Sequence, residues 1–259
     1  MTRADWIGLG WAGATGGLVL ALGPSALTLG VPAAAAALLV ADGVARPASQ
    51  VLVPTISRGP ARAGRRVALT FDDGPDPRWT PAIAERLEAA GVRGTFFCIG
   101  EHVLAHPALV RGLAAAGHEL GNHSFSHART LNFRLTAAME REVRRGETAL
   151  LSVLGEGPRP LYRPPIGLRN PSLARVARRL DLRVVNWSLH SRDTFARDPA
   201  AVADRVLTRC APGDIVLLHD GSDRPGADRS VTLAALPRIL EGLRQRQLEP
   251  VTVSELLAS

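Results

Sequence analysis

The stretch Thr70-Phe71-Asp72-Asp73-Gly74-Pro75, which follows the apolar run Val67-Ala68-Leu69, decides the fold prediction for this chain. A short apolar run that ends in two carboxylates and a Gly-Pro turn is typical of a strand reaching the rim of a barrel. Side chains alternate along a strand, so two consecutive aspartates point to different places. One can therefore bind a metal while the other handles a proton. For an Asp-Asp-Gly sequence alone, a strand followed by a simple turn is the alternative.

Three more polar motifs follow, each after an apolar run or within a loop. They are His123-Ser124-Phe125-Ser126-His127, Tyr162-Arg163-Pro164-Pro165 and Ile215-Val216-Leu217-Leu218-His219-Asp220. His123 and His127 are separated by three residues, so on one helical turn their imidazoles would face the same way. Two histidines and a carboxylate form a common open site for a catalytic metal. The same ligand types serve non-haem iron oxygenases, but there the ligands follow another order along the chain.

Between these motifs, short apolar runs alternate with amphipathic helical stretches, which predicts parallel β/α units. The strand candidates are 67–71, 94–99, 183–187 and 214–218. The helix candidates are 80–90, 103–116, 136–154, 171–180, 199–209 and 231–246.

In this order the motifs resemble those of the polysaccharide deacetylase family, also called the NodB homology domain or carbohydrate esterase family four. The resemblance covers roughly residues 65 to 255. It implies an α/β fold, namely a distorted, incomplete (β/α) barrel of the polysaccharide deacetylase type. In barrels of parallel strands the active site lies at the C-terminal ends of the strands. The motifs of this chain follow the predicted strands at these ends.

The resemblance also implies a role for each motif residue. The implied metal ligands are Asp73, His123 and His127. Asp72 is the implied general base, which Arg163 orients, and His219 is the implied general acid that protonates the leaving amine. A divalent metal lowers the pKa of water and polarises the acyl carbonyl, which hydrolysis of an acetamide at neutral pH requires.

Further positions implied by the resemblance surround the substrate. The backbone N–H of Ile166 would hold the oxyanion. The substrate pocket is expected to be lined by Leu217, Trp187 and Pro164, with Leu217 receiving the acetyl methyl group.

The chain departs from the family pattern at three positions. Ile166 stands where the family has Tyr, and Thr194 stands where it has Trp, so we expect a reshaped groove. His190 stands where the family commonly has Asp, the anion that tunes the catalytic histidine and arginine. Asp193 is the candidate to replace this anion, and we place both Asp193 and His190 around the catalytic residues.

The composition and charge of the chain indicate which kinds of molecule it is expected to bind. The formal net charge is +7, and all 31 basic residues are arginine. The arginines are scattered and no aromatic-interleaved basic patch occurs, so we predict no nucleic-acid partner. The charge fits anionic lipid headgroups or an acidic glycan better.

Two uncharged apolar segments, 6–22 and 26–41, flank Gly23-Pro24-Ser25. Each is slightly shorter than the roughly 20 residues that span a bilayer. We interpret residues 1–45 as a membrane-anchoring helical hairpin, 46–64 as a linker and 65–259 as the catalytic domain. The alternatives are a single signal anchor and a signal peptide cleaved near Gly43-Val44-Ala45.

The anchor predicts a location at the cell membrane but leaves the side of the catalytic domain open. In a hairpin both ends share one side, and arginines at positions 3, 46, 58, 62, 65 and 66 favour the cytoplasm. Trimming of cell-wall glycans requires the outside, whereas a lipid-linked sugar could be processed inside.

The sequence therefore predicts a metal-dependent carbohydrate deacetylase that hydrolyses the N-acetyl group of a GlcNAc-type glycan to a free amine and acetate. Peptidoglycan, chitin-like chains and exopolysaccharides are candidate substrates. Zn²⁺ suits the ligand set, with Co²⁺, Ni²⁺ and Mn²⁺ as alternatives. The alternative functions are a deacylase of a lipid-linked sugar and a catalytically weak glycan-binding member of the same fold. The oligomeric state stays open.

Overall fold

A curved sheet of parallel strands forms the centre of the computed structural model, which describes residues 3–155 and 161–258. Its strands are β1 Arg66–Asp72, β2 Thr95–Cys98, β3 Glu119–Asn122, β4 Leu161–Tyr162, β5 Leu189–His190, β6 Ile215–His219 and β7 Glu249–Val251. The strand order is β4-β3-β2-β1-β6-β5, and β7 also pairs with β1. All pairs are parallel. The parallel α/β fold expected from the sequence is therefore confirmed.

The chain just before β5, one edge strand of the sheet, also pairs with β4, the other edge strand. Val184 forms a parallel bridge with Tyr162 of β4, and Val185 bridges Ile56. The strand that we predicted over 183–187 is therefore found only in part, as these two parallel bridges, and the ladder with β6 forms further on, at Leu189–His190. Residues 184–185 instead link the opposite edge, so the sheet curves around toward closure.

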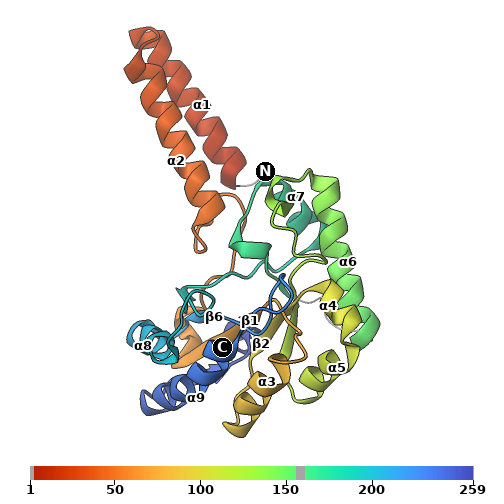
Figure 1. Cartoon of the computed structure of the whole chain (residues 1–259). Helices are drawn as coiled ribbons and strands as arrows, with labels where there is room; N and C mark the ends of the chain where they lie inside the picture. Colours follow the sequence, from red (N-terminus) through yellow and green to blue (C-terminus); the bar gives the residue numbers. More distant parts are fainter. Residues whose placement is uncertain (1–2, 156–160, 259) are drawn as a thin grey trace.

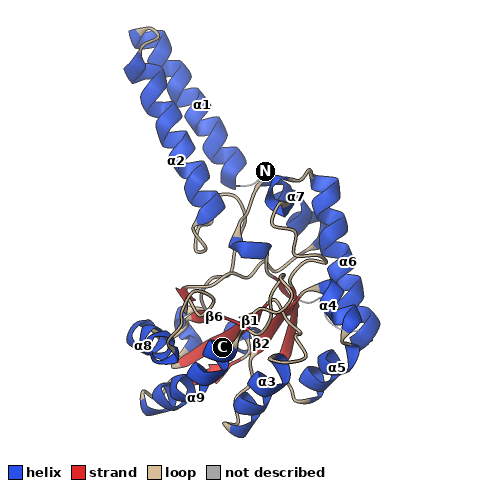
Figure 2. Ribbon diagram, viewed as in Figure 1, coloured by secondary structure: helices blue, strands red, loops and turns tan. Residues whose placement is uncertain are grey.

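Helices cover the outside of the sheet (Figures 1 and 2). They are α3 Thr80–Ala89, α4 Gly100–Ala105, α5 Pro107–Ala115, α6 Thr136–Leu154, α7 Pro171–Leu180, α8 Pro199–Arg209 and α9 Ser230–Gln245. The last helix, α10 Val253–Ala258, packs instead with Ala68 of β1 and Ile215 of β6 in a separate apolar cluster. Short helical turns occur at Ala61–Ala63, Leu131–Phe133 and Pro165–Gly167. The main core lies between strands and helices, where Phe71 of β1 is buried with Ile83 of α3 and Leu236 of α9. Strands that are buried on both faces appear in the sequence as continuous apolar runs, which is why β1, β2 and β6 were predictable.

Helix bounds follow local start signals. The helices α6, α7 and α8 begin and end where we predicted them. The side chain of Asn170 caps α7 by accepting the Leu173 N–H at 2.7 Å, and Pro171 occupies the first turn. The predicted helix over 103–116 is two helices, because Pro107 disfavours a helical conformation at His106.

The N-terminal residues form two helices, α1 Arg3–Leu22 and α2 Val31–Ala45, joined through the π-helical turn Ala26–Gly30. They lie side by side and project away from the domain on the side of α7 (Figure 1). By length and composition, one helix among the described residues, Leu27–Ala45, is suited to crossing a membrane, with a mean hydropathy of 1.8. The helix Leu9–Leu22 is apolar but shorter.

Residues 46–64, which we expected to be a linker, lie against the domain. Leu52 and Val53 are buried in a second apolar cluster together with Tyr162 and Leu173. The Gly59 N–H donates to the Gly213 carbonyl at 2.7 Å.

Candidate active site

The two aspartates end the central strand of the sheet. Asp72 is the last residue of β1 and pairs in register with His219 of β6. Asp73 leaves the strand with a φ of 75°, which turns its carboxylate toward the end of β3. Gly74 is required here, because a Cβ atom at this position would lie 2.0 Å from Oδ2 of Asp220.

Asp73, His123 and His127 lie together and are buried. Oδ1 of Asp73 is 3.3 Å from Nε2 of His123 and 3.2 Å from Nε2 of His127. One candidate ligand atom from each residue lies within 4.8 Å of the others. The three side chains expected to bind the metal therefore converge on one point.

The segment 123–127 is a loop after β3, so the prediction of one helical turn is wrong. Ser124 and His127 have φ values of 66° and 48°, outside the helical region. The side chain of Asn122 accepts the Ser124 N–H at 2.9 Å and donates to the Val143 carbonyl at 2.8 Å. These bonds hold an irregular loop that brings both imidazoles to the same side without a helix.

The protonation of the donors suits a divalent cation. Nδ1 of His123 lies 2.8 Å from the Arg163 carbonyl oxygen, so Nδ1 carries the proton and Nε2 presents its lone pair. Burial and the neighbouring His123 lower the pKa of His127, which favours its neutral, metal-binding ring. Burial would raise the pKa of Asp73, but the hydrogen bond and charge of His123 hold it well below its usual value. Burial would lower the pKa of His123, but Asp72 and Asp73 raise it. A cation bound here would displace that proton, because neutral imidazoles and an ionised carboxylate are the species that bind a cation.

Arg163 holds the Asp72 carboxylate. Its Nη1 donates to Oδ1 of Asp72 at 2.6 Å and to the Thr70 hydroxyl at 2.8 Å. Its Nη2 donates to the Asn186 carbonyl at 3.0 Å. Arg163 is fully buried, and its guanidinium lies over the Phe97 ring with 4.0 Å between Cζ and the ring centroid. The free oxygen of Asp72, Oδ2, is 3.7 Å from Nε2 of His123 and thus faces the candidate metal position.

His219, on the strand next to that of Asp72, is paired with Asp193. Nδ1 of His219 lies 3.0 Å from Oδ1 of Asp193, whose Oδ2 accepts the His219 backbone N–H at 2.8 Å. The Thr232 hydroxyl also donates to Oδ2 of Asp193, at 2.8 Å. Burial alone would lower the pKa of His219, but the charge and hydrogen bond of Asp193 raise it to about 9. Burial would raise the pKa of Asp193, yet the charge of His219 and its hydrogen bonds lower it to about 2. Asp193 thus provides a carboxylate beside His219, as we expected for the replacement of the Asp that the family commonly has at position 190.

His190 takes up a different position. Its Nδ1 accepts the Arg192 N–H at 2.9 Å, and its ring packs edge-on against Trp187 with a centroid distance of 5.7 Å. The rings of His190 and His219 are 6.2 Å apart. His190 therefore forms part of the groove wall.

A groove of about 670 Å³ joins these groups. Asp72, Asp73, His123, His127 and His219 line it, and so do Ile166, Trp187, His190, Thr194 and Leu217. Ile166 is half exposed with a φ of 51°, and its backbone N–H donates no hydrogen bond to any described residue.

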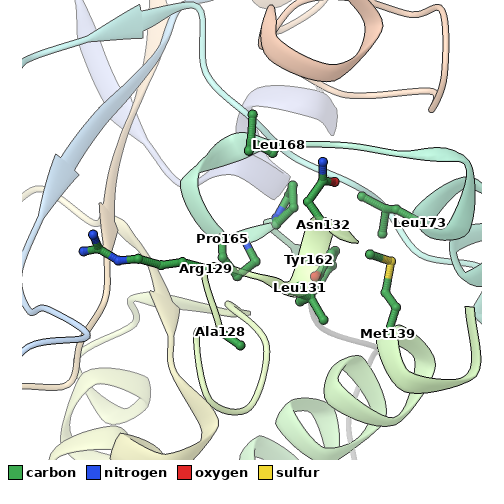
Figure 3. Close-up of a pocket in the computed structure, with 10 residues that line it drawn as sticks. Ala128, Arg129, Leu131, Asn132, Met139, Tyr162, Pro165, Leu168 and Leu173 are labelled. Carbon is green, nitrogen blue, oxygen red and sulfur yellow. The ribbon is translucent and has the colours of Figure 1, made fainter. Parts of the chain in front are cut away.

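Pro164 does not line this groove, in contrast to our expectation. It borders a separate small cavity of about 10 Å³, together with Tyr162, Met139 and Leu173 (Figure 3). Here it packs with the α6 and α7 side chains.

Two carboxylates near the histidine loop were missed in the sequence. Oε2 of Glu142, on α6, accepts both the backbone N–H and the hydroxyl of Ser126, at 3.1 and 2.9 Å. Asp223 lies 3.6 Å from Nδ1 of His127 and accepts two hydrogen bonds from Arg129, at 2.7 and 3.0 Å. A helix surface and a polar loop give such residues no pattern of their own, so only the fold reveals them.

Comparison with known proteins agrees with this geometry. A family model described as polysaccharide deacetylase matches residues 60–185. Over 193 residues the chain is 38% identical to the peptidoglycan-N-acetylglucosamine deacetylase of Bacillus cereus, covering 74% of this chain and 87% of the relative. Over 187 residues it is 33% identical to the chitooligosaccharide deacetylase of Azorhizobium caulinodans, covering 70% and 89%.

The fold is also similar to that of a deacetylase of known structure. The crystal structure of the Bc1960 peptidoglycan N-acetylglucosamine deacetylase aligns with a TM-score of 0.73 at 29% identity, over 79% of this chain and 93% of that one. The chain therefore belongs to the polysaccharide deacetylase family. By class it is a hydrolase of carbon–nitrogen amide bonds.

Proposed function

We propose that this protein is a metal-dependent N-deacetylase that converts an N-acetylglucosamine-type unit of a glycan to the free amine and acetate. The observation that supports this most strongly is the convergence of Asp73, His123 and His127 beside the Asp72–Arg163 pair. The relatives named for deacetylation of peptidoglycan and chitooligosaccharides support the substrate class.

Asp73, His123 and His127 would hold the cation, and Zn²⁺ suits two imidazoles and a carboxylate, with Co²⁺, Ni²⁺ or Mn²⁺ as alternatives. When bound, such a cation polarises the acyl carbonyl and makes water more acidic. Asp72 accepts the proton of the attacking water through Oδ2, while Arg163 keeps its other oxygen fixed. The acyl carbon gains a bond to oxygen in this step.

Collapse of the tetrahedral species breaks the carbon–nitrogen bond. The Ile166 N–H donates to the oxyanion. His219, protonated on both ring nitrogens because Asp193 raises its pKa, gives its Nε2 proton to the departing amine. Leu217 borders the groove next to His219 and is placed to receive the acetyl methyl group. A protein that only binds glycan does not need this acid and base, so their presence favours the enzyme over the weak binder.

The direct test is acetate and free-amine release from N-acetylglucosamine oligomers by the full chain in detergent, with zinc added. We expect Asp72→Asn to retain the metal but to lose about 10²–10⁴-fold in rate. Asp204→Asn, which changes an exposed carboxylate outside the groove, serves as the matched control. Equal rates for wild type and Asp72→Asn would refute the role of Asp72.

We further propose that residues 1–45 anchor the protein in the cell membrane and that residues 65–259 form the catalytic domain. The apolar side chains on α1, on α2 and on the turn between them support the anchor. Leu20, Leu22, Leu27 and Leu38 are between 72% and 90% exposed, which water alone would disfavour.

A further inference from the structure

We infer that the hairpin is clamped to the loop bordering the groove, and that the enzyme therefore acts on an N-acetylated sugar carried by a membrane lipid. This inference rests on the proposed function and specifies its substrate class.

The clamp is Arg169, which lies in the loop between the groove and α7 and is fully buried. Its backbone N–H donates to the Val44 carbonyl of α2 at 3.2 Å. Its guanidinium donates to the Ser49 carbonyl at 2.8 Å, to the Pro47 carbonyl at 3.2 Å and to the Arg46 carbonyl. One side chain thus satisfies three backbone carbonyls, those of Arg46, Pro47 and Ser49, at the point where the hairpin meets the domain.

Apolar packing and further hydrogen bonds reinforce this clamp. Leu52 and Val53 are buried in the cluster with Leu173 of α7, and Val44 packs against the same cluster. The Ile56 N–H donates to the Val184 carbonyl at 2.8 Å. A flexible linker would have neither a buried cation nor core side chains, so the hairpin base is fixed relative to the catalytic domain.

The same loop carries a wall of the groove. Ile166, which lines the groove, precedes Arg169 by three residues, so their Cα atoms are at most about 11 Å apart. Arg169 bonds to the last turn of α2. The Leu27–Ala45 helix is roughly 28 Å long, close to the hydrocarbon thickness of a bilayer of about 30 Å.

These lengths place the groove at the membrane surface. If Leu27–Ala45 spans the hydrocarbon core, Val44 lies at its boundary, and the headgroup layer is only about 6 Å thick on each side. The wall at Ile166 is then level with the headgroups or just above them. A groove fixed at this height can bind the sugars nearest the lipid of a lipid-linked saccharide. It cannot reach the sugars of a polymer that lie further from the membrane.

The test uses the full chain reconstituted in vesicles of neutral phospholipid with zinc. The probes are one chitooligosaccharide in three forms: joined to a lipid by a short spacer, joined by a long polyethylene glycol spacer, and free in solution. We expect the short-spacer form to release acetate roughly a hundredfold faster than the free form at equal total concentration, and faster than the long-spacer form.

A variant with twenty Gly/Ser residues inserted after Ala45 releases the clamp at Val44 and lets the domain move away from the surface. It should lose the preference for the short spacer over the long one and keep its rate on the free saccharide. The same insertion after Pro24, at the far end of the hairpin, is the matched control and should keep the preference. Equal rates on short and long spacers for the wild type would overturn the inference, whereas no release from any of the three forms would overturn the proposed function itself.

Discussion

At the residue scale, Asp193 controls the proton on His219. The sequence has His190 at the position where the family places its anion, and the structure supplies the missing charge from three residues further on. The change is possible because Asp193 lies in the same loop after β5 and is fixed by Thr232 and Ser191. The proposed acid His219 thus has a carboxylate partner at a different position in the sequence.

We predict that Asp193→Asn moves the basic limb of the pH profile of kcat/KM to lower pH. The pKa of His219 is about 9 in the folded protein, above its ordinary value of 6.5, so the ring stays protonated through neutral pH and loses its proton as the pH rises through about 9. Without the Asp193 charge the proton is lost earlier. Acetate release measured between pH 6 and pH 10 checks this.

Asp198→Asn is the control, because Asp198 caps α8 without contacting His219. Its basic limb should coincide with that of the wild type. An unchanged limb in Asp193→Asn would show that His219 is not the acid, or that Asp193 does not set its pKa.

At the element scale, α6 supports the loop that carries both histidines. Glu142 is buried on α6 and accepts two hydrogen bonds from Ser126, one residue before His127. We predict that Glu142→Ala weakens zinc binding by about tenfold, because outer partners of metal ligands contribute about 10–100-fold to affinity. Competition with a chromophoric chelator measures this Kd.

Glu142→Gln should recover part of the affinity, since its amide oxygen still accepts one of the Ser126 bonds. Glu140→Ala is the matched control, because Glu140 pairs with Arg144 and Arg179 on the outer face of the same helix. Wild-type zinc affinity in folded Glu142→Ala would contradict this role for α6.

Some helices and strands were predictable from the sequence, and others were not. Long helices with clear caps, such as α7 behind Asn170, were predictable to the residue. The strands β4 and β7 have only two and three residues, and β3 has one large apolar residue, Leu120, among its four, so none of them shows an apolar run and they were missed. The candidate site residues were proposed from their motifs, and they lie at or just after strand ends, including the ends of β3 and β4 that the sequence did not reveal. Their partners were not predictable, because Asp223 meets His127 only through the fold, 96 positions away along the chain.

At the scale of the whole molecule, the protein could bind a membrane in two ways. The two apolar helices α1 and α2 could insert into the bilayer, or the net charge of +7 could attract anionic lipid headgroups. Charge attraction is screened within about 3 Å at 1 M salt, whereas apolar insertion is not. We predict that the full chain floats with vesicles of both neutral and anionic lipid, and remains bound in 1 M NaCl. Release by salt, or binding to anionic vesicles alone, would show a peripheral protein held by arginines.

The proposed hydrolysis depends most on a cation held by Asp73, His123 and His127. The decisive measurement is acetate release by chelator-treated full-length protein as zinc is added back, followed together with the bound zinc per chain. We predict that activity rises in proportion to bound metal and stops rising at about one ion per chain, as one open three-ligand site requires. Full activity without bound metal would contradict the proposed metal-dependent chemistry.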